Sequence, residues 1–542
     1  MWNVIKELNR YFQTLKHLRF IQFYYRLIKL IPKKTEFKES ENILLRDYTN
    51  PSWFISNEHT SFNGIEFNFL NKKKVFTDMI WESKSEDPLW DYNLHYFNFL
   101  NEKLEIDKIN IVFSWINNTS FGKGIGYDPY PTSLRIVNLI KWTTAKRICN
   151  SKINKSIFLQ TRWLANNLEW HLLANHLFSN LKALIFSGYF FNTKESKIWL
   201  KNGKNELTKQ LKEQVLLDGG HYELSPMYHN IFILDLMDLY HLNRTFIDMH
   251  DEAFESILIE AIQRMLLWSK NMTHPDKEIA FFNDSAMNIA PIVDHLEKYF
   301  SIYIKLNKNH LNDINFLRES GYIRVNKGIW SAILDVGDIC PKFNPGHAHA
   351  DSLSFELSVN SERLFVNSGT SLYGNSDLRL FQRGTASHNT VEINKKNSSD
   401  VWHGFRVAKR AKNLGTKIHK NEEGIKITSS HNGYKKFYSG HIHSREWNFS
   451  ENLIAINDRI TGKTTEAISR LYIHPDVTII EFSETYINIQ LKSKLNLKIS
   501  IISDGFSIKE SLYFYTFGKS IKNKCIEIKL KENKALIKLS LI

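Results

Sequence analysis

The sequence predicts an α+β protein of several domains, in which a helical N-terminal region is followed by an antiparallel β-sandwich. Two observations lead to this prediction. Long helical segments dominate from about residue 85 to 310, and short alternating runs dominate from about 318 onward. The 542 residues, 42% of them hydrophobic and 24% charged, have globular proportions and suffice for two or more domains.

Residues 1–60 are predicted to form a basic amphipathic helical segment. Apolar residues recur there at steps of three and four, namely Ile5, Leu8, Phe12, Leu15 and Leu18. Such a helix packs on its own protein or lies on an anionic membrane surface, and we expect packing, with peripheral membrane contact through residues 1–34 as the alternative. No small-residue cleavage site follows, so we expect no secretory signal.

Residues 61–315 are predicted to form a helical domain. Its long segments are 159–191, 201–216, 230–242 and 252–269. Several helices of similar length, separated by short loops, are typical of a bundle, a solenoid or an α/α toroid.

Residues 316–542 are predicted to form the β-sandwich. Its short alternating runs are 329–336, 353–359, 453–460, 477–480, 486–491 and 495–502. Evenly spaced short strands favour two packed sheets. The lysines between the last apolar positions are expected on solvated strand faces, where they hinder edge pairing.

Charge and composition exclude several classes of function. The net charge of +14 comes from 71 basic and 57 acidic residues, and the excess lies at the two ends, without any nucleic-acid-binding motif. No apolar stretch approaches the length that spans a bilayer. The three cysteines lie far apart and form no disulfide framework. No nucleotide, flavin or pyridoxal-phosphate motif is present, so we expect no organic cofactor and no nucleic acid partner.

Two motifs of the helical region could carry chemistry. His176 and Asn180 are four residues apart and share a helix face, which fits a buried structural pair as well as a site. Ser225 followed by Pro226 predicts a helix start that places Tyr228 and His229 in the first turn. The positive end of that helix would stabilise an anion, although a capped helix with a core tyrosine fits equally well.

Two further motifs lie in the sheet region. His347, His349 and Asp351 would share one face of a strand that runs on into Leu353, Phe355 and Leu357. Two imidazoles in this arrangement could bind a metal or divide the roles of ligand and base. His388 supplies another nitrogen donor, and nearby Arg379 and Arg383 could pair with anionic groups.

These motifs belong to longer stretches that together carry a resemblance. The stretches are WDYNLHYFNFL (90–100), PYPTSLRIVNLIKW (129–142), HLLANHLFSNLKAL (171–184), DGGHYELSPMYH (218–229), FNDSA (282–286), HAHADSLSFEL (347–357), SGTSLYGNSDLRLFQRGTASHNTVEI (368–393) and VWHGFRVAKRA (401–411). With these stretches the sequence resembles the heparinase II/III-like family of polysaccharide lyases and its alginate-lyase relatives. The resemblance implies an incomplete α/α toroid, a β-sandwich, and a cleft between them where an anionic, uronic-acid-containing polysaccharide is cut by β-elimination.

The resemblance also implies roles for individual residues. Asn175 would bind the uronate carboxylate, His176 and Tyr228 would form the acid/base pair, and His347 would be a further neutralising or basic group. Tyr228 would protonate the leaving oxygen. The same stretches contain the residues expected to contact substrate, which are Tyr92, His95, Arg135, Glu223, His229, Tyr373, Arg379 and Arg383.

A structural zinc ion is a further implication of the resemblance. His349 and His388 match two of the family's ligands, whereas Asn367 stands where the third ligand is an aspartate. A neutral amide is a poorer zinc ligand than a carboxylate, so the sequence leaves zinc occupancy open, with Asp351 as an alternative third ligand.

Two other functions stay open on the sequence alone. A glycoside hydrolase would use two carboxylates, for which Asp218, Glu223 and Asp284 are candidates. A non-catalytic protein of surface-polysaccharide metabolism, in capsule or exopolysaccharide assembly, would keep the pocket without turnover. The resemblance suggests the bacterial cell envelope or periplasm, and the expected lack of a signal makes the cytoplasm the alternative location.

Overall fold

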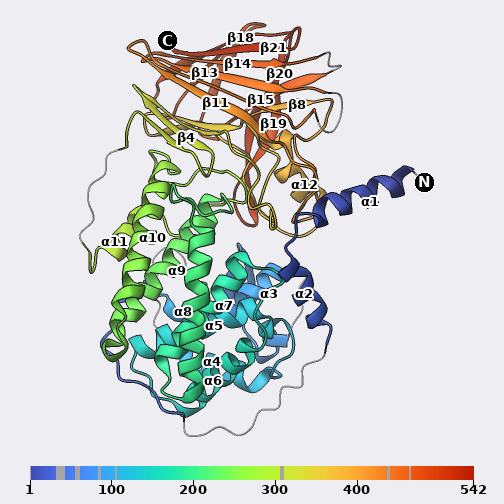
Figure 1. Ribbon diagram of the computed structural model, residues 1–542. Coiled ribbons are helices and arrows are strands. Elements are labelled where there is room, and N and C mark those ends of the chain that lie inside the picture. The colour runs from blue at the N-terminus through green and yellow to red at the C-terminus, as the bar shows by residue number, and fades with distance from the viewer. Residues whose placement is uncertain are drawn as a thin grey trace.

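The computed structural model describes residues 2–31, 43–54, 61–82, 87–103, 107–304, 311–435, 440–462 and 466–542. Figure 1 shows a helical domain with a sheet domain stacked on one end of it. Each domain has its own large hydrophobic core. The predicted fold class, a helical domain followed by an antiparallel β-sandwich, is confirmed.

The helices precede almost all of the strands in the chain. The N-terminal helices are α1 (Trp2–Leu15) and α2 (Phe20–Lys29). The helical domain contains α3 (Pro88–Tyr96), α4 (Lys108–Asn118), α5 (Pro129–Ala145), α6 (Ser151–Ala165), α7 (Ala174–Phe190), α8 (Lys194–Gln214), α9 (Pro226–Thr245), α10 (Glu252–Asn271) and α11 (Val293–Phe300). A hairpin of β1 (Glu66–Phe69) and β2 (Lys72–Val75) precedes α3, and short 3-10 helices lie at Asp78–Glu82, Asn98–Asn101, Ile125–Tyr127, Ile247–Met249 and Thr385–Ser387.

Helix α7 is the central element of the helical domain. It packs against α5, α6, α8 and α9. Nearly every residue from Leu177 to Phe190 is buried, which a helix tolerates only when apolar or hydrogen-bonded side chains surround it. The first turn of α7 therefore has a rigid support, and this turn carries Asn175 and His176.

The segment 159–191, which the sequence predicts as one helix, is two helices. The chain leaves the helical conformation after Ala165, and Leu173 and Ala174 have φ values of 62° and 51°. Such left-handed residues cannot continue a right-handed helix. The break makes α7 begin at Ala174, so that Asn175 and His176 lie at a helix start.

The sheet domain contains nearly all of the remaining strands, together with helix α12 (Asp377–Arg383). The strands are β3 (Ile314–Leu317), β4 (Tyr322–Lys327), β5 (Trp330–Asp335), β6 (Phe355–Val359), β7 (Glu362–Phe365), β8 (Val391–Ile393), β9 (Val401–Trp402), β10 (Arg406–Val407), β11 (Asn413–Lys420), β12 (Ile425–His431), β13 (His443–Phe449), β14 (Leu453–Ile460), β15 (Ala467–Ile473), β16 (Thr478–Phe482), β17 (Tyr486–Gln490), β18 (Asn496–Ile502), β19 (Phe506–Thr516), β20 (Lys519–Lys529) and β21 (Lys534–Leu541).

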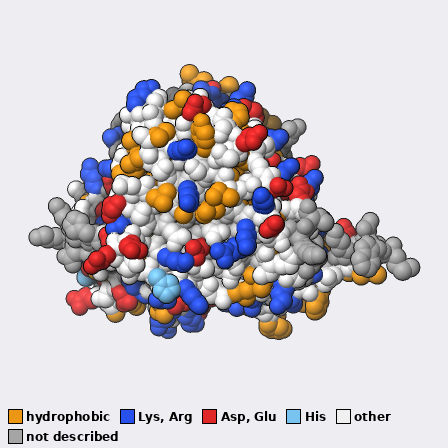
Figure 2. Space-filling view, turned by 90° about the horizontal axis from the view of Figure 1, so that it is seen from above, with side chains coloured by type: hydrophobic (Ala, Val, Ile, Leu, Met, Phe, Trp, Pro, Cys, Tyr) orange, Lys and Arg blue, Asp and Glu red, His pale blue; other side chains and the backbone are white. Residues whose placement is uncertain are grey.

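Two antiparallel sheets form the sandwich. One has the strand order β11-β12-β13-β14-β21-β18-β17-β16 and the other β19-β20-β15-β7-β6-β5-β4-β3, with β8 paired to β15. Burial alternates along β13, and its Trp447 lies opposite Ile456 of β14 in the register. Inward-facing residues of both sheets form one core, as expected for a sandwich. At the end of the molecule formed by these sheets, basic and acidic side chains occur together (Figure 2).

The predicted strand through the histidine motif is mostly wrong. Only Phe355–Val359 forms a strand, and residues 347–354 form an irregular loop. Leu353 has a φ of 62°, which interrupts an extended chain. The positions of His347 and His349 therefore depend on their hydrogen bonds to Asp284 and not on strand alternation.

The N-terminal helices are present, but the expectation that their apolar stripe packs on the protein is wrong. On α1, Leu8 is 64% exposed and Phe12 is 63% exposed. Among the described residues, no helix has the length and apolar character needed to cross a membrane.

A buried ion cluster joins three helices of the helical domain. Asp238 of α9 accepts from Lys141 of α5 at 3.0 Å and from Lys182 of α7 at 2.8 Å. Burial favours the neutral acid, but the two lysines outweigh it and lower the pKa of Asp238 to about 2. Lys182 also contacts Asp235 at 2.6 Å.

We predict that Asp238→Asn lowers the free energy of unfolding by about 3 to 5 kcal/mol, because it leaves buried lysines without their shared counterion. Asp294→Asn, which removes a surface partner of Lys277, should cost less than about 1 kcal/mol. Denaturant unfolding of both variants measures the difference.

Because the folded pKa of Asp238 is depressed, its contribution to the free energy of unfolding is present above its unfolded pKa of about 3.9 and is lost as the pH falls toward 2. Equal losses in the two variants would contradict the assignment.

Candidate active site

The carboxylate of Asp284 lies at the junction of the two domains, in the loop between α10 and α11. It is fully buried and accepts hydrogen bonds from Arg379 through both of its oxygens. His347 Nδ1 and His349 Nε2 each lie 2.9 Å from one of the oxygens. Burial alone would raise the pKa of Asp284, but Arg379 and the two imidazoles hold it well below its usual range. Thr370 Oγ1 donates a further hydrogen bond at 3.4 Å, so an ionised carboxylate with five hydrogen bonds joins the helical domain to α12 and the histidine loop.

The backbone of Asp284 fixes the start of α9. Its carbonyl oxygen accepts from Ser225 Oγ at 2.6 Å, and its N–H donates to the carbonyl of His347 at 3.0 Å. Ser225 is the N-cap of α9, as predicted, and its hydroxyl accepts from the N–H of Tyr228 at 3.2 Å. One residue thus sets the position of both Tyr228 and His347.

Tyr228 and His347 come from different domains and lie in direct contact. Their ring centroids are 4.0 Å apart, and Tyr228 Oη lies 2.9 Å from Tyr373 Oη. Burial and the neighbouring Tyr373 and Asp284 hold the pKa of Tyr228 well above its usual value, so its phenol keeps its proton. Ionised Asp284 can only accept, so His347 carries its proton on Nδ1 and Nε2 is left for other partners.

His176 and Asn175 form the other side of the arrangement, at the start of α7. His176 Nδ1 lies 3.1 Å from the carboxylate of Glu169, whose second oxygen accepts from Asn180 at 3.1 Å. The predicted face shared by His176 and Asn180 is thus confirmed. Burial opposes the charged imidazole, but Glu169 outweighs it and raises the pKa of His176. The half-buried side chain of Asn175 is bonded to no other residue that the structure describes.

Glu223 and Tyr130 connect these two groups of residues. Glu223 is 2% exposed, and the charges of both His347 and His176 act on its pKa, which burial raises. The ring centroid of Tyr130 lies 4.6 Å from that of His176. Tyr130 also lies close enough to Tyr228 to contribute to the raised pKa of that phenol. His176, Tyr228 and His347 therefore lie around Glu223 and Tyr130 at the junction of the domains.

Other predicted substrate contacts have structural partners instead. His95 is buried and accepts from Trp115 Nε1 at 3.1 Å. Arg135 lies over the ring of Trp115 and donates to Gln160 at 2.8 Å. Burial lowers the pKa of His95 to about 3, which makes it a neutral core residue. The structure thus places His95 and Arg135 behind the site, within the helical core.

His229 and Arg383 are also engaged within the fold. His229 Nε2 lies 2.9 Å from the carbonyl of Met265, and burial lowers the pKa of this imidazole to about 3. Arg383 donates to the carbonyls of Ala348 and His403 and so shapes the histidine loop. Tyr92 donates to Asp128 at 2.6 Å. Tyr373 and Arg379 remain next to the reacting groups, Tyr373 in the site and Arg379 as the partner of Asp284.

The predicted metal ligands meet only in part. His349 Nδ1 lies 3.1 Å from His388 Nε2, and each ring uses its far nitrogen on a different acceptor, Asp284 or the carbonyl of Gly384. The facing nitrogens thus present lone pairs, an arrangement that a shared cation or proton stabilises. The amide of Asn367, however, bonds the backbone of Phe281 and Asn389.

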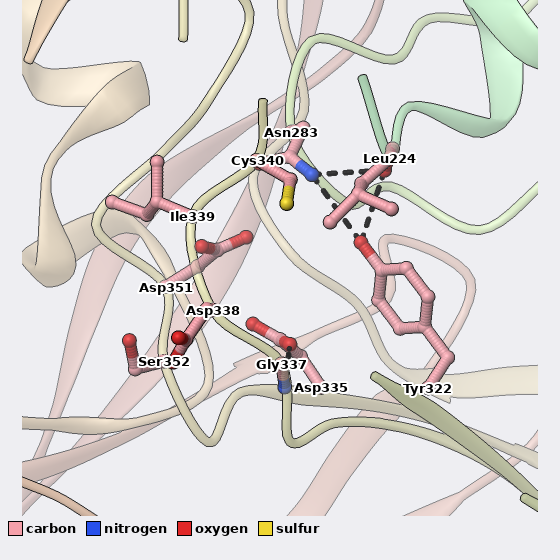
Figure 3. Close-up of a pocket in the computed structure, with 10 residues that line it drawn as sticks. All are labelled: Leu224, Asn283, Tyr322, Asp335, Gly337, Asp338, Ile339, Cys340, Asp351 and Ser352. Carbon is pink, nitrogen blue, oxygen red and sulfur yellow. Dashed lines mark hydrogen bonds between the residues drawn. The ribbon is translucent and has the colours of Figure 1, made fainter. Parts of the chain in front are cut away.

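A third donor for zinc is therefore not in place. Within the described ranges, no three His, Cys, Asp or Glu side chains are grouped so that they could hold a metal ion. Asp351, the alternative ligand, faces a separate cavity of about 10 Å³ that Asp335 and Cys340 also line (Figure 3), and one of its oxygens is buried without a partner among the described residues.

Two of the three carboxylates proposed for a hydrolase are held by hydrogen bonds within the fold. Asp218 accepts from the N–H and hydroxyl of Ser320, and Asp284 is held by Arg379. Of these three carboxylates, only that of Glu223 has an oxygen without a hydrogen-bond partner among the described residues. A hydrolase needs two carboxylic groups that face the glycosidic bond, so this arrangement does not favour hydrolysis.

Two supporting residues were missed by sequence reasoning. Asp284 lies in the matched stretch FNDSA but was considered only as a hydrolase carboxylate, and Glu169 lies just before a matched stretch. The sequence gives little indication of either residue, because both lie in loops, where hydrophobic periodicity carries no information. Asp284 orients His347, and Glu169 orients His176.

Comparison with known proteins gives consistent matches. A family model described as the heparinase II/III N-terminus matches residues 151–309, and one described as heparinase II/III-like, C-terminal, matches residues 309–539. The heparin-sulfate lyase of Bacteroides stercoris is 25% identical over 370 residues, 62% of this chain and 51% of that protein. The heparin-sulfate lyase of Pedobacter heparinus is 24% identical over 294 residues, 49% of this chain and 42% of that protein. The chain thus spans about half the length of these relatives.

A crystal structure of heparinase III has a TM-score of 0.68 to this chain, with 17% identity, and the match covers 85% of this chain and 79% of that one. This likeness shows that the two share a fold. The two family models together match most of the chain, from residue 151 to 539. The chain therefore belongs to the heparinase II/III-like family.

Proposed function

We propose that this protein is a polysaccharide lyase that cleaves a uronic-acid-containing anionic glycan by β-elimination. The observation that carries the proposal is the 4.0 Å contact between Tyr228 and His347, which brings a protonated phenol and an oriented imidazole together across the two domains. Asn175 and His176 supply amide and imidazole donors to the same site.

Neutralisation of the uronate carboxylate is the first requirement of the reaction. Removal of the C5 proton builds negative charge on that carboxylate, which donors fixed in advance stabilise best. His176, whose pKa Glu169 raises, can carry positive charge, and Asn175 precedes it in the first turn of α7. We assign both residues to the carboxylate.

Proton transfer is the second requirement. We assign His347 Nε2 as the base that takes the C5 proton, because Asp284 holds the other nitrogen of its ring. The electron pair of the C5–H bond forms the C4–C5 double bond, and the C4–O bond breaks toward oxygen. Tyr228 donates its phenolic proton to that oxygen. This division differs from the one that the resemblance implies, in which His176 is the partner of Tyr228.

Heparin or heparan sulfate is the substrate class that we propose first, because the matched relatives are described as heparin-sulfate lyases. We expect an ultraviolet-absorbing, unsaturated product when the purified protein is incubated with this class in a panel of uronate glycans. Hydrolysis would yield reducing ends without this absorbance, and binding without any product would indicate a non-catalytic protein. The zinc ion and a place in the cell envelope stay predictions, of which metal analysis tests the first.

We predict that Tyr228→Phe lowers turnover at least about 100-fold, because it removes the acid and keeps the ring. Substrate binding should change little, so kcat falls more than KM. Product absorbance measures both. Tyr303→Phe, on the exposed side of the helical domain, is the matched control and should retain full activity. Turnover of Tyr228→Phe equal to that of the control would overturn the assignment.

We predict that Glu169→Gln shifts the alkaline limb of the kcat/KM profile to lower pH. The Glu169 carboxylate raises the pKa of His176, so its removal makes the imidazole lose its charge at a lower pH. The pH dependence of product formation measures the shift. Glu195→Gln, at a more exposed pair with Arg162, should leave the profile in place. A Glu169→Gln profile that coincides with wild type would refute the role of His176.

A further inference from the structure

Helices α1 and α2 each present an apolar face to solvent. Eleven of the exposed large apolar side chains lie between Ile5 and Ile31. Phe12 is 63% exposed on α1, Phe20 and Leu27 are 82% and 66% exposed on α2, and Leu30, directly after α2, is 78% exposed. These positions recur at helical spacing, so they form a stripe and are not scattered. Soluble surfaces rarely show so many neighbouring apolar side chains without an interaction partner.

The opposite faces of both helices are fixed to the protein. Arg10 of α1 binds Asp400 of the sheet domain at 2.7 Å. On α2, Tyr25 stacks on Trp170 of the helical domain with ring centroids 5.8 Å apart, and Gln22 is 2% exposed. The apolar stripe therefore points outward because polar and aromatic contacts hold the other side.

The surroundings of the stripe are basic. Residues 1–34 contain eight Lys or Arg residues and one Glu, a net charge of +7. At the junction of the two helices, Arg410, Lys342 and Lys412 lie close enough to act on the pKa of His17. An apolar stripe with flanking cations matches an anionic phospholipid surface, where apolar side chains enter the acyl boundary and cations contact headgroups.

We infer that the outward face of α1 and α2 docks this protein on an anionic phospholipid bilayer. A second copy of the chain is a poorer occupant, since pairing through this face would bring two +7 segments together. This inference concerns a surface separate from the reacting groups and does not rest on the proposed lyase activity.

The anchors of the two helices lie beside the candidate active site. Figure 1 shows α1 extending from the side of the molecule near α12, with α2 against the helical domain. Tyr11 of α1 contacts Trp402 of β9, and nearby Phe405 has its ring 6.2 Å from that of His347. Trp170, the partner of α2, directly follows Glu169. Docking would therefore hold the candidate active site near the bilayer.

The test is co-sedimentation of the full chain with vesicles. We expect binding to vesicles of phosphatidylglycerol and phosphatidylcholine at least tenfold tighter than to phosphatidylcholine alone, and weaker binding at high salt. The double variant Phe12→Ser/Leu27→Ser should lose at least tenfold in affinity for the anionic vesicles. Ile480→Ser/Phe482→Ser, which removes equally exposed apolar side chains from β16, is the matched control and should bind as wild type does.

Lys16→Glu is a second variant that leaves the apolar stripe intact, and it should also weaken binding. Thermal melting and turnover of a soluble glycan should match wild type in all three variants, which separates this result from a failure of the proposed activity. Absence of binding to anionic vesicles, or equal binding by Phe12→Ser/Leu27→Ser and wild type, would overturn the inference. A wild-type dimer that this double variant dissociates, without vesicle binding, would assign the face to a second copy instead.

Discussion

The buried carboxylate of Asp284 is the interaction on which the arrangement of the site depends. It belongs to the helical domain, and its partners Arg379, His347 and His349 belong to the sheet domain. A buried charge is tolerated only when it is paired and hydrogen-bonded, and five hydrogen bonds meet that requirement here. The same residue receives the hydroxyl of the Ser225 N-cap through its carbonyl oxygen. The positions of Tyr228 and His347 are therefore coupled through one amino acid.

Electrostatics divides the site into two halves with different protonation. Around His176, the Glu169 carboxylate favours the imidazolium. Around Tyr228, burial and neighbouring acidic groups favour the neutral phenol. A cation for a carboxylate and a protonated acid for a leaving oxygen are what elimination next to a uronate needs. This division follows from which carboxylates lie near which ring.

Much of the fold could be predicted from sequence because periodicity reports burial directly. The strand at Leu453–Ile460 was predicted with the bounds that the structure shows, and the helix start at Ser225 was predicted from its cap and proline. The break before α7 could not be predicted, since Leu173 and Ala174 adopt left-handed conformations that neither residue type signals. The loop that carries His347 could not be predicted for the same reason, since Leu353 also adopts a left-handed conformation.

The sequence predicted only those parts of the candidate site that lie in recognisable motifs. Tyr228 and His347 lie in contact, and the charges of His176 and His347 both act on the pKa of Glu223. His95 and Arg135 belong to the same kind of matched stretch but serve the core, because a buried polar residue and a substrate contact look alike in sequence. Asn367 shows the converse case, since its amide is occupied by backbone groups that only the folded chain brings near.

The division of the Asp284 cluster between two domains has a consequence for assembly. Until the helical domain supplies its carboxylate, Arg379 in the sheet domain has no counterion for a position that ends up without solvent. Neither half of the molecule can reach its final state alone at this junction, so docking of the domains and completion of the reaction centre become a single event. A chain caught before that event would lack the proposed reaction centre and would display an unneutralised guanidinium.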